Sequence, residues 1–181
     1  MRHIPNLICL LRIALIVPLV IAMRDGAHER IILLFLLAAV SDGLDGYLAK
    51  RYNWTSDLGR FLDPLADKLL LVTVFITAAW LDIAPWWLTA AAVARDIVIA
   101  VGALIYKLWF GQLNGRPTLI SKINTGMQLG YLLAVILASA SGFPPREVLD
   151  ALAVVVLITI LLSGADYVGR FVRRAFAQVA H

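Results

Sequence analysis

Residues 41–68 read SDGLDGYLAKRYNWTSDLGRFLDPLADK, and this stretch holds five aspartates in a chain that is otherwise strongly apolar. Apart from Asp57, they form two pairs, Asp42 with Asp45 and Asp63 with Asp67, spaced three and four residues apart. Residues at these spacings are neighbours on a helix surface, so each pair shares a face if its segment is helical. An aspartate at the centre of a membrane helix costs roughly 2.5 to 3.5 kcal/mol, and four converging carboxylates also repel one another. A bound polyvalent cation would offset both costs, so we expect the active centre here.

The composition of the whole chain is that of a membrane protein. Of its 181 residues, 61% are hydrophobic and only 15% are charged, whereas roughly 25% are charged in an average soluble domain. The mean hydropathy is +0.86. We therefore expect an all-α integral membrane protein with a single domain over residues 1–181. The net charge of +4 suits anionic lipid headgroups, and we expect no nucleic-acid partner.

Apolar runs separated by charged or Pro/Gly-containing breaks predict six transmembrane helices. Their approximate bounds are 4–23, 31–49, 62–81, 84–107, 120–141 and 147–168. Most lysines and arginines fall on the connections that share a side with the N-terminus, and the positive-inside rule therefore predicts that both termini are cytoplasmic. The aspartates would then face the cytoplasm, at the end of the second helix and the start of the third.

Small and basic residues accompany the aspartates. Glycines permit a bulky ligand to approach the carboxylates, and basic side chains supply the positive charge that phosphate recognition requires. These residues are Gly43, Gly46, Gly59, Lys50, Arg51 and Arg60. Oxygen-only ligands suit hard cations such as Mg²⁺ or Mn²⁺, which commonly also coordinate substrate phosphates. The alternative is a solvated acidic face, or structural ion pairs with Lys68 and Arg60, but the interleaved glycines favour the metal site.

The order of these residues resembles the signature of the CDP-alcohol phosphatidyltransferases. It runs Asp42-x-x-Asp45-Gly46-x-x-Ala49-Lys50, then eight residues, then Gly59-x-x-x-Asp63-x-x-x-Asp67. The resemblance covers nearly the whole chain, because that family is built on six transmembrane helices with a cytoplasm-facing site. This chain departs from the family at Lys50, where arginine is usual. Lysine keeps the charge but loses the planar fork of arginine.

The resemblance implies a role for each matching residue. Asp42, Asp45 and Asp63 would hold two divalent ions, Mg²⁺ or Mn²⁺, at the pyrophosphate of CDP-diacylglycerol. Asp67 would be both a metal ligand and the general base that takes the proton of the acceptor hydroxyl. The residues that would bind CDP-diacylglycerol are Gly46, Ala49, Lys50, Arg51, Gly59 and Arg60. The resemblance also implies a homodimer, and we expect it in the inner membrane of a bacterium.

The acceptor alcohol is indicated by two further stretches. FLDPLADK at 61–68 is similar to the branch of the family that makes phosphatidylglycerophosphate and cardiolipin. PTLISKINT at 117–125, with the preceding Arg95-Asp96 pair, is more similar to the eukaryotic-type cardiolipin synthases. The resemblance therefore implies phosphatidylglycerol as acceptor, with cardiolipin and CMP as products. The alternative acceptor is glycerol 3-phosphate, in a phosphatidylglycerophosphate synthase.

Three basic residues are candidates for binding the acceptor phosphate: Arg95, Lys122 and Arg12. Each has a structural alternative. Arg95 could form an ion pair with Asp96 or across helices, whereas Lys122 and Arg12 could extend to the membrane interface. A cation- or proton-coupled transporter would also contain acids within the membrane. It would usually carry polar groups on towards the far side, however, and here the acids stay on the expected cytoplasmic half.

Overall fold

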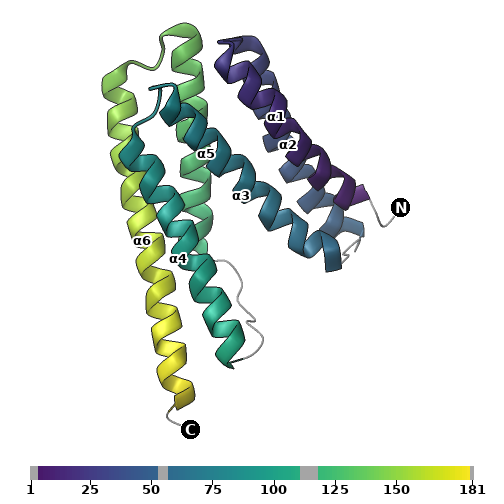
Figure 1. Ribbon diagram of the computed structural model, residues 1–181, viewed down its shortest axis with the longest axis vertical. Coiled ribbons are helices and arrows are strands. Elements are labelled where there is room, and N and C mark those ends of the chain that lie inside the picture. The colour runs from purple at the N-terminus through teal and green to yellow at the C-terminus, as the bar shows by residue number, and fades with distance from the viewer. Residues whose placement is uncertain (1–3, 53–56, 111–117, 180–181) are drawn as a thin grey trace. The chain divides into compact units, whose positions relative to one another are not determined.

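The computed structural model describes residues 4–52, 57–110 and 118–179. Within these ranges the side chains are described except at 4–6, 42–52, 57–64, 106–107, 110, 172 and 174–179. The regular secondary structure of the described residues is entirely helical (Figure 1). Its helices are α1 (Ile4–Arg24), α2 (His28–Tyr52), α3 (Asp57–Trp80), α4 (Trp86–Phe110), α5 (Leu119–Ser141) and α6 (Arg146–Val179). The expected all-α class is confirmed.

Three helices extend into polar sequence by three or more residues beyond their predicted bounds. α2 spans His28–Tyr52 instead of 31–49, α3 begins at Asp57, five residues before the expected start at 62, and α6 continues to Val179 instead of ending at 168. An apolar run marks the part of a helix suited to the hydrocarbon of the membrane, whereas backbone hydrogen bonding continues into polar sequence that still favours a helix. The apolar pattern alone therefore assigns the polar ends of these helices to the connections.

Positive-φ residues follow three of the helices. Gly26 after α1 has φ 65° and Gly142 after α5 has φ 74°, a region in which glycine meets no steric penalty. The N–H of Gly142 donates to the carbonyl of Ala138 at 2.8 Å, which satisfies one of the last carbonyl groups of α5. Asp82 after α3 has φ 56°, a conformation that aspartate tolerates better than most residues with a Cβ atom.

The molecule places apolar side chains outward and several polar ones inward. Among the described residues, four segments are long and apolar enough to cross a bilayer: Leu7–Arg24, Trp86–Ile105, Leu119–Ser141 and Arg146–Phe171. Large side chains such as Leu161 are exposed, whereas Arg12 and Asn124 are fully buried. A surface of this kind suits lipid, because polar groups within a bilayer face the protein interior. The protein is an integral membrane protein.

The chain divides into two compact units. The first unit contains Met1–Pro85 and Leu132–Pro145, and the second contains Trp86–Tyr131 and Arg146–His181. In the first unit, α1 packs against both α2 and α3 (Figure 1). In the second unit, α4 packs against α6. α1 is thus the common neighbour of the two helices that carry the aspartates.

A glycine permits the close approach of α4 and α6. A Cβ atom built on Gly102 would lie 2.9 Å from Cε2 and 3.0 Å from Cδ2 of Phe171. Real Cβ atoms are almost never found that close to a neighbouring carbon, so the ring of Phe171 occupies the space that a side chain at 102 would need. Small residues allow helices in membranes to pack closely, and much of their attraction comes from such van der Waals contact.

We predict that Gly102→Ala lowers the thermal stability of the purified protein relative to Gly126→Ala. Both changes gain about 0.5–1 kcal/mol of helix propensity, but only the first places a methyl group against Phe171. Nothing lies within 4 Å of a Cβ atom at Gly126, so that variant should be neutral or slightly stabilised. Melting in detergent measures both variants, and equal melting temperatures would contradict the proposed close contact.

Candidate active site

The four aspartates lie on helical backbone. Asp42 and Asp45 are within α2, and Asp63 and Asp67 are within α3. Spacings of three and four residues on a helix place each pair on one face, as the sequence predicts. The described side chains include that of Asp67. The side chains of the other residues expected to bind the metal ions or CDP-diacylglycerol lie outside the described set, namely Asp42, Asp45, Gly46, Ala49, Lys50, Arg51, Gly59, Arg60 and Asp63.

Asp67 forms an ion pair with Arg12 of α1. The Arg12 guanidinium donates through Nη1 to Oδ1 of Asp67. The Arg12 side chain is completely buried, whereas that of Asp67 remains 38% exposed. A charge that is this deeply buried requires a partner of opposite sign, and α1 supplies the arginine because it packs along α3. One oxygen of the expected catalytic carboxylate is therefore held in a fixed position.

This pairing was not predicted from the sequence. Arg12 was expected either to bind the acceptor phosphate or to extend to the membrane interface, but a side chain with no exposed surface does not extend to the interface. The acceptor-phosphate role of Arg12 stays a prediction. The sequence did contain a signal for an ion pair, because a lone arginine within an apolar membrane helix usually pairs with a carboxylate on a neighbouring helix. The sequence does not specify which of the four aspartates is its partner.

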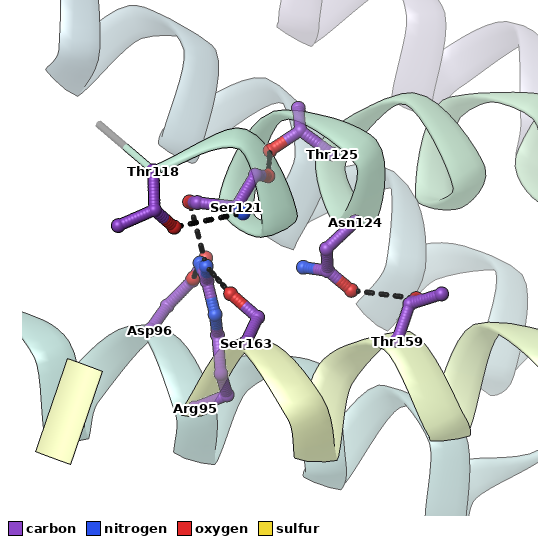
Figure 2. Close-up of polar contacts among 8 residues, drawn as sticks. All are labelled: Arg95, Asp96, Thr118, Ser121, Asn124, Thr125, Thr159 and Ser163. Carbon is purple, nitrogen blue, oxygen red and sulfur yellow. Dashed lines mark hydrogen bonds and ion pairs between the residues drawn. The ribbon is translucent and has the colours of Figure 1, made fainter. Parts of the chain in front are cut away.

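Arg95 of α4 is the centre of a second polar cluster, in the second unit. It is 7% exposed, and its Nη1 donates to Oδ1 of Asp96 at 2.7 Å. Its Nη2 donates to the hydroxyl of Ser121 at 2.8 Å and to that of Ser163 at 2.5 Å. The guanidinium also lies over the ring of Tyr167, 5.7 Å from its centroid. Figure 2 shows Arg95 reaching from its helix towards the two serines, which belong to α5 and α6.

The ion pair expected as the structural alternative for Arg95 is therefore present, and binding of the acceptor phosphate by Arg95 stays a prediction. Sequence reasoning missed Ser121 and Ser163, the hydrogen-bonding partners of Arg95. Their signal was weak, because an isolated serine is common in membrane helices, where it can hydrogen-bond to its own backbone. The periodicity of Ser121, Asn124 and Gln128 along α5 was more informative, since these residues recur on one helical face.

Lys122 lies in the first turn of α5, and its side chain is exposed. Thr118 precedes this helix and caps it: the N–H of Ser121 donates to the Thr118 hydroxyl at 3.1 Å, and the N–H of Lys122 donates to the Thr118 carbonyl at 3.1 Å. Such caps satisfy backbone donors that have no partner within the helix. The cap fixes where α5 starts, and in the sequence Lys122 follows Ser121, whose hydroxyl Arg95 contacts.

The donors available around the aspartates fit a hard divalent cation. Asp67 presents a partly exposed carboxylate, and the sequence places a second aspartate on α3 and two on α2. Mg²⁺ and Mn²⁺ prefer such oxygen ligands and commonly share them with substrate phosphates. Because Arg12 engages Oδ1 of Asp67, a cation at Asp67 would share the carboxylate with a guanidinium. The residues present are therefore compatible with a metal centre.

Comparison with known proteins identifies the family. The family model for the CDP-alcohol phosphatidyltransferases matches residues 2–164, most of the chain. The chain belongs to the CDP-alcohol phosphatidyltransferase family. It is therefore an enzyme of this transferase class, and the expected family is confirmed. Enzymes of this family generally use divalent metal ions, whereas the assignment of the aspartates as their ligands stays a prediction.

Similar CDP-alcohol phosphatidyltransferases fall into two groups by acceptor. The CDP-diacylglycerol–glycerol-3-phosphate 3-phosphatidyltransferase of Bacillus subtilis is 31% identical, with 92% of this chain and 94% of the relative aligned. The cardiolipin synthase (CMP-forming) of Streptomyces coelicolor is 38% identical over 54% of this chain and 48% of the relative. The rat cardiolipin synthase (CMP-forming) is 29% identical over 91% of this chain and 60% of the relative.

We predict that the Arg12–Asp67 pair contributes to stability as a unit. Arg12→Met and Asp67→Asn should each lower the melting temperature by roughly 4–8 °C, since a hydrogen bond to a charged group is worth about 2 kcal/mol and each kcal/mol corresponds to roughly 2–4 °C at this size. The partial exposure of Asp67 keeps this loss below that of a fully buried pair. The double variant should lose less than the sum of the single variants. Strict additivity in detergent melts would show that the two side chains do not interact.

Proposed function

We propose that this enzyme transfers a phosphatidyl group from CDP-diacylglycerol to a hydroxyl of phosphatidylglycerol, giving cardiolipin and CMP. The observation that carries the transfer reaction is the spacing of the four aspartates on the helices α2 and α3, in a chain of this family. The choice of phosphatidylglycerol is supported by the Arg95-Asp96 and PTLISKINT stretches and by the similarity to cardiolipin synthases.

In the proposed reaction the acceptor hydroxyl attacks the phosphorus that bears the diacylglycerol group. The new P–O bond forms as the bond to CMP breaks, and CMP leaves with the electron pair. Asp67 takes the proton of the hydroxyl, as a carboxylate within hydrogen-bond reach can do. Arg12 holds one oxygen of Asp67, so the carboxylate meets the acceptor in a defined orientation. Such pre-orientation accounts for a large part of many enzymatic rate enhancements.

Asp42, Asp45, Asp63 and Asp67 would hold the two divalent ions, which when bound neutralise the pyrophosphate and the CMP leaving group. Gly46, Ala49 and Gly59 would leave room for the cytidine. Lys50, Arg51 and Arg60 would offset the charge of the phosphates. On the acceptor side, Arg95 and Lys122 would contact the phosphate of phosphatidylglycerol. These assignments rest on the match between the residues of this chain and the family signature.

Glycerol 3-phosphate is the second candidate acceptor. It is favoured by the Bacillus subtilis relative, which is named for that acceptor and aligns with 92% of this chain. Arg95 and Lys122 do not by themselves separate the two acceptors, since both acceptors carry a phosphate. A direct comparison of the two acceptors, with lipid products identified, therefore tests this choice. Nothing in the comparisons favours the transporter alternative, and we do not propose it.

We further propose that the active site faces the cytoplasm of a bacterial cell and that the protein is a homodimer in the inner membrane. The orientation is supported by the distribution of lysine and arginine along the sequence, and the dimer by the family resemblance. The treatment of residues 1–181 as a single functional domain likewise stays a prediction. Labelling of cysteines introduced at the chain ends, from one side of sealed vesicles, would test the orientation.

We predict that Asp67→Asn abolishes turnover, lowering it by at least the roughly 10²–10⁴-fold that a general base supplies. Binding of CDP-diacylglycerol should be partly retained, because three other aspartates remain. CMP release from labelled CDP-diacylglycerol measures turnover, and retention of the labelled lipid measures binding. The control is Asp82→Asn, the same chemical change at an exposed residue that follows α3. Turnover close to that of the unmodified enzyme would remove Asp67 as the base.

We also predict that EDTA stops CMP release and that added Mg²⁺ or Mn²⁺ restores it. The four carboxylates provide oxygen ligands for either ion, and without a cation their mutual repulsion would oppose binding of a pyrophosphate. The measurement is CMP release against metal concentration, with Asp42→Asn expected to need more metal than the unmodified enzyme. Activity that resists exhaustive chelation would contradict the metal site.

A further inference from the structure

Polar side chains continue from Arg95 into the apolar interior of the second unit. On α5, Ser121, Asn124 and Gln128 recur at three- and four-residue spacing and so share one face. On α6, Thr159 lies one turn from Ser163. Its hydroxyl shares its one proton between the carbonyl of Val156 at 2.8 Å and Oδ1 of Asn124 at 2.9 Å. Ser121 and Gln128 are seven positions apart, or roughly 10 Å along the helix axis. We call these five residues, together with Arg95, the polar seam.

Three N–H groups in the seam have no hydrogen-bond partner among the described residues. They are Nε of Arg95, Nδ2 of Asn124 and Nε2 of Gln128. The three residues are 7%, 0% and 2% exposed, respectively. A buried donor without a partner lowers the free energy of unfolding by about 1–3 kcal/mol, and the seam contains three such donors. All three groups are donors, so a ligand that satisfied them would have to offer acceptor oxygens.

The Asn124 amide is oriented by its neighbour. Because Oδ1 accepts from Thr159, the remaining amide nitrogen is turned away from that hydroxyl. Figure 2 shows this nitrogen on the side of Asn124 that faces Ser163 and Arg95. The unpartnered amide donor and the Arg95 guanidinium therefore belong to one local environment, lined by hydroxyls and N–H groups.

The charges around the seam nearly cancel. Arg95 is paired with Asp96 at 2.7 Å, with side chains 5% and 14% exposed. Arg170 is paired with Asp166, one turn beyond Ser163, at 2.9 Å. The remaining described charge beside the seam is the exposed Lys122. Among the described side chains, this environment therefore offers one net positive charge and several neutral donors.

A site with this balance discriminates between acceptor phosphates by their charge. The phosphodiester of a lipid such as phosphatidylglycerol carries one negative charge, whereas a phosphate monoester carries about 1.5 to 2 at neutral pH. The second charge would enter a poorly solvated site without a matching cation, and an uncompensated charge is strongly disfavoured there. Neutral amide donors can still satisfy the oxygens of a monoanion.

We infer that Asn124 and Gln128 extend the acceptor site of this enzyme, and that the seam selects an acceptor whose phosphate is a monoanionic diester. This inference rests on the proposed phosphatidyl transfer. It goes further by assigning acceptor selectivity to two neutral amides and to the pairing of Arg95 with Asp96. Asn124 and Gln128 donate to phosphate or glycerol oxygens of the acceptor, and Thr159 keeps the Asn124 amide correctly oriented.

The test compares kcat and KM for phosphatidylglycerol and for glycerol 3-phosphate, each with the same CDP-diacylglycerol, in the purified full-length protein. The unmodified enzyme should prefer phosphatidylglycerol. Asn124→Leu removes the amide, and it should raise the KM for phosphatidylglycerol about tenfold while leaving the KM for CDP-diacylglycerol unchanged. Thr125→Leu is the matched control, because the Thr125 hydroxyl bonds only to the backbone of its own helix in the described hydrogen bonds.

A charge variant tests the selectivity directly. Asn124→Lys adds a cation, and relative to Asn124→Met, a neutral side chain of similar length, it should shift the ratio of kcat/KM values towards glycerol 3-phosphate by about tenfold or more. Gln128→Leu repeats the loss of an amide donor at a second position, should Asn124 variants not fold in detergent melts.

The outcomes separate the inference from the proposed function. If the unmodified enzyme consumes neither acceptor, the proposed phosphatidyl transfer fails and the inference fails with it. If it makes lipid product but prefers glycerol 3-phosphate, or if amide removal at 124 and 128 changes no acceptor KM, the transfer stands and the inference is overturned. In the second case the unpartnered amides serve only internal water molecules.

Discussion

The ion pair between Arg12 and Asp67 constrains the arrangement of the first unit. A guanidinium with no exposed surface can remain charged only if a carboxylate is within reach. α1 must therefore pack on α3 in the one register that brings the two side chains together. α1 also packs against α2, so the helix that fixes Asp67 is the neighbour of the helix that carries Asp42 and Asp45. The partner that the buried guanidinium requires thus also orients the carboxylate proposed as the general base.

The second unit meets the same requirement in a different way. Arg95 is compensated by Asp96 on its own helix and by hydroxyls of two other helices. Its guanidinium is therefore shared among α4, α5 and α6, and the serines act as neutral partners. Close contact at Gly102 adds van der Waals attraction between α4 and α6. Because lipid tails are as apolar as leucine, contacts of these two kinds contribute much of the cohesion that water would otherwise provide.

The sequence predicted the elements better than their contacts. The apolar runs located the helices of the described residues, because the bilayer sets the length and apolar character of membrane segments. The aspartates lie on helical backbone in α2 and α3, as their spacing predicts. The early start of α3 and the extension of α6 were missed, since polar residues can continue a helix. The partner of Arg12 was also missed, because pairing between helices depends on their register. Asn124 carried a periodic signal, but its unpartnered amide is visible only in three dimensions.

The extension of α6 has a consequence for how deeply this helix sits. Among the described side chains, the segment suited to the hydrocarbon reaches Phe171, and the helix continues to Val179. Arg170 and Arg173 lie at this boundary and are exposed. Sliding α6 one turn towards the opposite leaflet would pull both guanidinium groups below the headgroups, and sliding it outward would expose apolar turns to water. The boundary arginines therefore limit movement of α6 along the membrane normal, and they keep Ser163 and Thr159 at a constant depth in the bilayer.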